Sequence, residues 1–378
     1  MTEPLSKIPN GFRYYSARDA RVRRTIEAAA MAVFDGWSYE EILTPTVDYY
    51  SLFECGMGKG EAHRAFRFTD ADGRLLALRP DVTSGIARLA ATLFAERERP
   101  LRLCYSAAVF HQQGESHANW RRESTQLGCE LFGMNTMAAD MEVLAIAAEV
   151  LRRLSLDDSF VITLNDVQIF NGIVEKLPLD PVARDELRRL VDVRAVADLE
   201  SFLGAYTSAH ECQAFADLIQ LSGKGEIFEK ARRGITNSRS RAGLDRLESL
   251  WRVIESLSLS KHFEIDLGDV ARLDYYTGLT FKIYVEGVGM RVGSGGRYDN
   301  LTARFGKAEP AVGFVLELDE LANCLTYYGE LASTQEPRGT VINSAGDDVS
   351  ALFRKALETR ASDEAIKLNV REVDSCRN

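Results

Sequence analysis

Short strand-like runs and helical patterns alternate at irregular spacing along most of this 378-residue chain. Several strand-like runs are joined by hairpin-type turns, and the runs 65–69 and 74–78 flank one such turn, which ends in glycine. This arrangement predicts an α+β fold with a mainly antiparallel sheet. The remaining predicted strands are 101–105, 126–132, 159–164, 263–266, 281–285 and 291–293.

Helical periodicity marks the segments between the strands. Apolar residues recur at helical spacing over 16–34 and again over 137–154, and Gly36 stands where the C-terminal cap of the first helix belongs. The run 37–46 is β-like and ends at Pro45. These segments alternate with the predicted strands, as expected for an α+β domain.

A change of pattern divides the chain into three parts. After the start signal Asp180-Pro181 the sequence becomes almost continuously helical, and a polar hinge at 333–338 precedes a β-α-β-like pattern. The predicted parts are a core of residues 1–169 and 259–329, a helical insertion of residues 170–258 and a short C-terminal α/β appendage of residues 330–378.

Charge and cysteine content argue against several functions. The formal net charge of -10 supplies no general attraction to nucleic acid. The N-terminus has no apolar signal region, and no run approaches the roughly 18 apolar residues of a membrane span, so we expect no membrane partner. No histidine or cysteine spacing fits a metal site. Six separated cysteines favour reduced thiols in a cytoplasmic protein.

Two polar segments at strand ends are candidates for a binding site. Asp81 and Thr83 follow a predicted strand, and a carboxylate there suits a ligand ammonium group; alternatively, Asp81 caps the helix that begins at Thr83. Residues 126–132 alternate so that Gln126 and Glu130 share one strand face. That face lines a cavity or is a solvated sheet surface.

A glycine-rich segment at 293–299 follows a tyrosine-rich segment at 272–278. The glycines allow close backbone approach to a ligand, and a glycine-rich bulge is the alternative. Neither segment has the pattern of a P-loop or the context of a dinucleotide-binding fingerprint. Nucleotide binding of these two kinds is therefore not indicated.

The blocks LRPDVT, QLGCELFG, LDYYTG, GSGGRYDNL and PAVGFVLEL occur in this order. Over residues 10–328 the chain closely resembles the catalytic domain of class II histidyl-tRNA synthetases. The resemblance implies a class II aminoacyl-tRNA synthetase-like fold, with a six-stranded antiparallel sheet flanked by helices. It also implies a homodimer built partly through residues 36–45.

The same resemblance implies a histidine-binding pocket. Asp81 stands where the family has a glutamate that binds the α-amino group, and Glu130 where it has the carboxylate that reads the imidazole N–H. Tyr276 matches the tyrosine at the other ring edge. The full set of implied histidine-binding residues is Asp81, Thr83, Gln126, Glu130, Tyr275, Tyr276 and Tyr298.

The positions that bind ATP in the synthetases depart from the family. Residues 110–113 lack its phosphate-binding arginine and the following glutamate, Ala271 replaces its catalytic arginine with Arg272 shifted by one position, and Glu320 replaces the arginine of the last motif. Losing one preorganised donor typically costs about 10²–10³ in rate. We therefore expect no adenylation, no catalytic residues and no cofactor.

A histidine pocket without these residues or a full anticodon domain resembles the ATP phosphoribosyltransferase regulatory subunit family. This resemblance implies a non-catalytic chain that forms a homodimer within a hetero-oligomer, binds the short-form catalytic subunit and takes part in feedback inhibition of histidine biosynthesis by histidine. It implies no tRNA binding. An active histidyl-tRNA synthetase, a stand-alone histidine sensor and a tRNA-related binding module are the alternatives.

Overall fold

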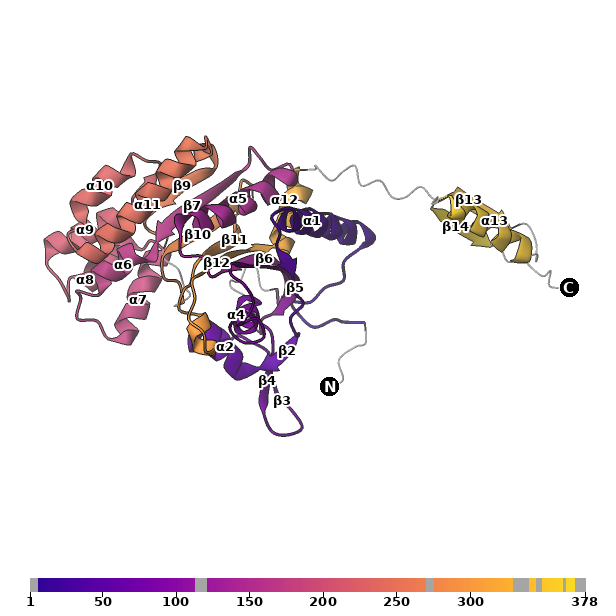
Figure 1. Cartoon of the computed structure of the whole chain (residues 1–378), viewed down its shortest axis with the longest axis horizontal. Helices are drawn as coiled ribbons and strands as arrows, with labels where there is room; N and C mark the ends of the chain where they lie inside the picture. Colours follow the sequence, from indigo (N-terminus) through magenta and orange to yellow (C-terminus); the bar gives the residue numbers. More distant parts are fainter. Residues whose placement is uncertain are drawn as a thin grey trace.

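A nine-stranded sheet organises the protein, whose computed structural model describes residues 6–112, 121–269, 275–287, 289–328, 340–344, 349–362 and 365–370 (Figure 1). The strand order is β1-β5-β6-β12-β11-β10-β7-β9-β8. In that order the strands are Glu40–Glu41, Leu101–Phe110, Glu123–Phe132, Ala311–Glu317, Arg291–Arg297, Leu279–Val285, Phe160–Asp166, Phe263–Asp266 and Ser222–Gly223.

Six neighbouring strands, from β5 to β7, pair antiparallel throughout. At the edges β1 joins β5 and β9 joins β7 in parallel, and β8 adds a short antiparallel strand. The predicted α+β class and the six-stranded antiparallel sheet are therefore confirmed. Strand β12 was not predicted, although Ala311–Glu317 lies within the block PAVGFVLEL.

Side-chain alternation along β6 separates two cores. Leu127, Cys129 and Leu131 belong to the large core, whereas Phe132 belongs to a smaller core on the other face of the sheet. Several helices contribute to the large core, and the longest of them cover that face (Figure 1). Among them are α1 (Ala17–Gly36), α5 (Met137–Arg153), α11 (Ser238–Ser256) and α12 (Leu318–Tyr328).

The second face of the sheet is covered only in part. Helix α4 (Thr83–Ala91) packs there in the smaller core. A three-stranded sheet of order β2-β4-β3 packs with α2 and α3 in a separate cluster nearby. These elements are β2 (Val47–Tyr49), α2 (Tyr50–Met57), α3 (Lys59–Ala62), β3 (Arg67–Thr69) and β4 (Leu75–Leu78), and the predicted hairpin between 65 and 78 is β3–β4.

The connection after α1 differs from the prediction. Ser16 and Asp19 form a capping box at the helix start, but the helix runs through Gly36, and Ser38 takes the positive φ of 62°. Of the run 37–46, only Glu40–Glu41 pairs with another strand. The expected longer strand is wrong, because this segment turns back toward β5 directly after the helix.

Six helices occupy most of the segment predicted to be helical. They are α6 (Val167–Val174), α7 (Pro181–Asp192), α8 (Val196–Leu203), α9 (Ala209–Ile219), α10 (Ile227–Gly234) and α11. Asp180 caps α7 as expected, with Pro181 at its first position. Helices α6 to α9 form their own core, whereas α10 and α11 pack into the large core of the sheet.

The C-terminal appendage has the expected β-α-β pattern (Figure 1). Strands β13 (Thr340–Ser344) and β14 (Ile366–Val370) pair in parallel, and helix α13 (Val349–Ala361) packs on them through Leu352 and Ala356. The predicted hinge at 333–338 lies outside the described residues.

Candidate functional site

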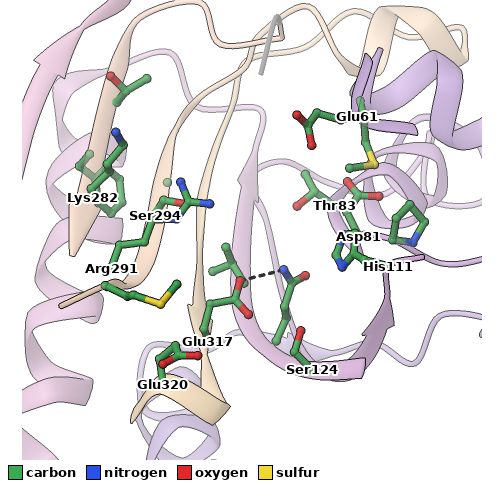
Figure 2. Close-up of a pocket in the computed structure, with 18 of the residues that line it drawn as sticks. Glu61, Asp81, Thr83, His111, Ser124, Lys282, Arg291, Ser294, Glu317 and Glu320 are labelled. Atoms are coloured by element: carbon green, nitrogen blue, oxygen red, sulfur yellow. Dashed lines mark hydrogen bonds between the residues drawn. The ribbon is translucent and has the colours of Figure 1, made fainter. Parts of the chain in front are cut away.

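A polar cavity of about 210 Å³ lies on the partly covered face of the sheet (Figure 2). Its floor is formed by β6, β12, β11 and β10, and its walls include residues at the starts of α3 and α4. Six acidic and four basic side chains line it: Glu61, Asp81, Asp269, Glu317, Asp319 and Glu320, and Arg64, Arg121, Lys282 and Arg291.

Glycines on neighbouring strands make room in this floor. Gly296 pairs with Gly313, and Gly313 pairs with Glu130. A Cβ atom on Gly313 would lie 1.8 Å from Glu130 Oε2, and one on Gly296 would lie 2.8 Å from Tyr276 Cε1. These glycines therefore provide the space that the carboxylate and the phenol ring occupy.

Asp81 has two different carboxylate oxygens. Oδ2 accepts hydrogen bonds from the Ser84 backbone N–H at 3.3 Å and from the Ser84 hydroxyl at 2.9 Å. Oδ1 is buried, and no described residue donates to it. Burial raises the pKa of Asp81 to about 6, against the opposing effect of the Ser84 bonds. Asp81 thus bonds to the helix start with one oxygen and leaves the other for a donor.

Glu130 lies behind the cavity wall and is 1% exposed. It accepts hydrogen bonds from the hydroxyls of Thr83 at 2.7 Å, Tyr105 at 3.3 Å and Tyr298. Burial raises the pKa of Glu130 to about 7, although these three bonds favour its charged form. The carboxylate can therefore exchange a proton near neutral pH.

Gln126 and the tyrosines complete this half of the cavity. The Gln126 amide donates a 3.1 Å hydrogen bond to Glu317 across β6 and β12, drawn as a dashed line in Figure 2. The ring of Tyr275 lies 4.8 Å from that of Tyr276 and 5.7 Å from that of Tyr298. The result is an aromatic wall beside an amide and two carboxylates.

Carboxylates occupy the other half, where β12 leads into α12. Glu320 bonds to Arg121 at 3.1 Å and to Asn323 at 3.0 Å. Asp319 bonds to Arg23 at 2.6 Å and to Tyr15 at 2.7 Å. Burial opposes ionisation of Asp319, but these partners outweigh it and hold its pKa below the usual value. Arg121 is thus engaged by two carboxylates of the protein itself.

The structure brings five of the seven sequence-derived site residues to the cavity wall: Asp81, Thr83, Gln126, Tyr275 and Tyr276. Glu130 and Tyr298 bond to each other behind it. The substituted positions Gln113, Ala271 and Arg272 lie outside the described residues.

Several further residues of the wall were not singled out from the sequence, among them Lys282, Arg291 and Glu317. Lys282 lies two residues after Thr280 in β10, and Glu317 lies two residues after Val315 in β12, so each shares a strand face with another residue of the wall. The period-two alternation of a strand could therefore have predicted that they face the cavity. Arg291 could not have been found in this way, because its orientation depends on an irregularity of β11.

Two negative findings apply to the described part of the chain. No group of three or more potential metal-binding side chains occurs there. None of its helices is both long enough and apolar enough to cross a membrane.

Comparison with known proteins identifies the class of this fold. The sequence matches the histidyl-tRNA synthetase family over residues 11–321. A histidyl-tRNA synthetase structure from Nostoc shares the fold with a TM-score of 0.78 at 20% identity, over 99% of this chain and 88% of the other. The protein is thus of the class II synthetase-like type.

Closer relatives define the family. The ATP phosphoribosyltransferase regulatory subunits of Moorella thermoacetica and Syntrophotalea carbinolica are 36% and 32% identical, over 96% and 93% of this chain and 92% and 82% of theirs. A Bacillus halodurans structure described as an ATP phosphoribosyltransferase regulatory subunit/histidyl-tRNA synthetase is 28% identical, with a TM-score of 0.85, over 99% of this chain and 96% of the other. This chain belongs to the ATP phosphoribosyltransferase regulatory subunit family.

Proposed function

We propose that this chain is a non-catalytic regulatory subunit of a hetero-oligomeric ATP phosphoribosyltransferase and that free histidine binds in the cavity. The buried, unpartnered Oδ1 of Asp81 is the observation that carries the ligand assignment. A buried acceptor without a donor is unfavourable, and a ligand ammonium group removes that cost. We also propose that the protein is located in the cytoplasm, as expected for a subunit of this biosynthetic enzyme.

The remaining cavity groups suit the rest of histidine. Gln126 and Tyr276 line the same cavity as Asp81. The Gln126 amide oxygen can accept from the ligand ammonium group, and the Tyr276 phenol can bond to one ring nitrogen. Glu130 reads the other ring nitrogen once the hydroxyl of Thr83 or Tyr298 moves aside. In the structure these hydroxyls donate to the Glu130 carboxylate. Ligand binding would therefore exchange one of these hydrogen bonds for a bond to the ligand.

The charge of the cavity supports a role without adenylation. Six carboxylates line it against four basic side chains, and Glu320 with Asp319 engages Arg121 in the half that corresponds to the phosphate-binding half of a synthetase. A triphosphate placed there would meet like charges within a partly buried site, which is strongly unfavourable. We therefore assign neither aminoacylation nor tRNA binding to this chain.

Assembly follows from the same proposal. Two copies of this chain form a homodimer partly through the segment after α1, where Leu43 is 81% exposed. Leu93, which follows α4, is equally exposed and lines the same cavity as Leu43. The homodimer binds the short catalytic subunit. Feedback inhibition requires that histidine bind the active and inactive assemblies with different affinities, because a ligand that binds both equally shifts nothing.

Activity of the reconstituted enzyme tests the proposal. Phosphoribosyl-ATP formation from ATP and phosphoribosyl pyrophosphate is measured for the catalytic subunit alone, for this chain alone and for the mixture, each with and without histidine. We expect activity to need the mixture and to fall with histidine. Equal activity of the catalytic subunit alone contradicts the proposal.

Histidine-dependent exchange of pyrophosphate into ATP separates the synthetase alternative, and we expect no exchange above background. A stand-alone sensor is excluded if this chain and the catalytic subunit co-elute in gel filtration. Co-elution with tRNA instead would favour the tRNA-related module.

A further inference from the structure

Lys282 on β10 lies between the cavity and the helical insertion. Its side chain lines the cavity, and Figure 2 shows it on the side opposite Asp81. Its ammonium group contacts two carboxylates. Asp269, a residue of the cavity wall, forms a close ion pair with it, and Asp192, the last residue of α7, lies 3.9 Å from it. One cation thus joins the ligand site to a helix of the insertion.

A second ion pair, with reversed polarity, joins the same two parts of the chain. Arg194, in the turn between α7 and α8, pairs with Asp266 at the end of β9. Asp266 and Asp269 belong to one tight turn, in which the Asp266 carbonyl accepts from the Asp269 N–H at 3.2 Å. The insertion therefore presents an anion and a cation to a lysine and an aspartate of the core.

Backbone contacts hold the same core turn to another part of the insertion. The Leu267 N–H donates to the Leu221 carbonyl at 3.0 Å, and a Cβ atom on Gly268 would lie 2.1 Å from the Ile219 carbonyl oxygen. None of these four residues lines the cavity. The insertion thus has a fixed attachment between α9 and β8 beside the ionic attachment of the α7–α8 turn.

The two contacts of Lys282 differ in length and burial. The Asp269 side chain is 9% exposed and also accepts a 3.2 Å hydrogen bond from the Thr163 hydroxyl, whereas the Asp192 side chain is more distant and 18% exposed. Attraction between charges falls with distance and with access to water. The contact with Asp192 is therefore the weaker of the two, and it is the first to be lost when another anion approaches Lys282.

We propose that histidine binding weakens the contact between Lys282 and Asp192 and loosens the α7–α8 turn from the core, so that the helical insertion responds to occupancy of the cavity. The inference rests on the proposed function, because it takes histidine as the ligand. The carboxylate of the bound amino acid competes with Asp192 for the same ammonium group. By linkage, the Asp192 contact weakens histidine binding by the same factor.

Calorimetry on the full chain tests the competition. Asp192→Asn removes the competing charge and leaves the residues that line the cavity unchanged. We expect it to bind histidine about two- to fivefold more tightly than the wild type, the size of a partly exposed ion pair. Asp198→Asn removes an exposed carboxylate from α8, and as the matched control it should bind as the wild type does. An Asp192→Asn affinity equal to or lower than the wild-type value contradicts the proposal.

Hydrogen exchange measured by mass spectrometry tests the response of the insertion. Saturating histidine should speed exchange of the backbone amides of residues 193–203 several-fold and leave residues 219–223 unchanged. Lys282→Met should show the fast exchange without ligand. Lys261→Met is its control and should exchange as the wild type does, because Lys261 also contacts two carboxylates but does not line the cavity.

The two measurements separate the possible failures. If the wild type binds histidine but exchange of residues 193–203 stays the same or slows, the coupling is wrong while histidine binding stands. Equal acceleration of residues 219–223 also contradicts the coupling, because the response then does not pass through the ionic attachment. If the wild type does not bind histidine at all, both this inference and the proposed ligand are wrong.

Discussion

Thr83 donates a 2.7 Å hydrogen bond from its hydroxyl to Glu130 Oε1, and this bond joins the wall of the cavity to a buried carboxylate behind it. Thr83 also stands at the first position of α4, which packs on the sheet through Ile86, Ala87 and Ala90. A ligand that competes for Glu130 therefore acts directly on the start of a packed helix.

Replacing Thr83 by valine keeps the side-chain shape and removes this bond. We expect Thr83→Val to lower the free energy of unfolding by about 1–3 kcal/mol, because a buried charged acceptor loses a donor. Urea unfolding measures the change. Thr25→Val is the control, since Thr25 is an exposed helix residue that bonds only to its own helix, and it should change stability by less than about 0.5 kcal/mol. Equal losses for the two variants would contradict the role given to Thr83.

Glu130 should make stability depend on pH. Its pKa is about 7 in the folded protein against an ordinary value of 4.5, so the folded state binds its proton more tightly than the unfolded state. The free energy of unfolding of the wild type, compared with that of Glu130→Gln, is therefore highest below about pH 4.5 and falls as the pH rises through about 7. By pH 8 the relative loss should be on the order of 3 kcal/mol.

Thermal and urea unfolding of both proteins from pH 5 to pH 8 measure this loss. Glu229→Gln removes a charge from a side chain that is 84% exposed and should leave the pH profile as in the wild type. A constant difference between wild type and Glu130→Gln across the range would show that Glu130 does not titrate there.

Asp81 should make histidine affinity depend on pH in the opposite direction. Its pKa of about 6 means that the carboxylate is ionised at pH 7.5 and mostly protonated at pH 5. We expect Asp81→Asn to bind histidine at least about tenfold more weakly at pH 7.5, the loss of one charge-assisted hydrogen bond. The ratio of the two affinities should approach one at pH 5. Using the ratio cancels the protonation of the ligand's own imidazole, and a ratio that stays constant with pH excludes Asp81 as the ammonium partner.

Gly313 should not accept a side chain. A Cβ atom there would lie 1.8 Å from Glu130 Oε2 and 2.5 Å from the Cys129 carbonyl oxygen, so Gly313→Ala must displace the carboxylate or separate two strands. We expect a loss of about 1–3 kcal/mol in the free energy of unfolding, together with weaker histidine binding. Gly60→Ala, where no atom lies within 4 Å, is the matched control and should be tolerated. Chemical unfolding measures the stability of both variants, and calorimetry measures their histidine affinity. Equal results for the two variants would contradict the role given to Gly313.

The proposed homodimer depends on exposed apolar side chains. Leu43 and Leu93 border a second cavity, whose other walls include Leu52 and Phe53. We expect Leu43→Glu to convert the dimer to a monomer in light scattering coupled to gel filtration, because the charge would have to be buried in the interface. Leu257 caps the C-terminal end of α11 and is 55% exposed, so Leu257→Glu is the control and should leave the dimer intact. A monomeric wild type would exclude the homodimer.

Most elements of the fold could be predicted from local sequence. Helices α1 and α5 follow apolar periodicity with recognisable starts, and the β3–β4 hairpin follows from its turn residues. Some predicted strand limits were too short, as in β5, which was predicted to end at Tyr105 but extends to Phe110. Those residues are held by the ladder to β6, a non-local interaction that local patterns do not contain.

For the candidate site, the sequence determined which chemical groups are present and, through period-two alternation, that Gln126 and Glu130 share a strand face. It could not show that Thr83 stands between Glu130 and the cavity, because that depends on how α4 packs against β6. Nor could it show that Arg291 rather than Val292 faces the cavity, since that depends on one extra residue in the pairing of β10 with β11. Local sequence thus determined the composition of the site, and only the tertiary structure decided its geometry, because register and helix packing arise from contacts between residues far apart in the chain.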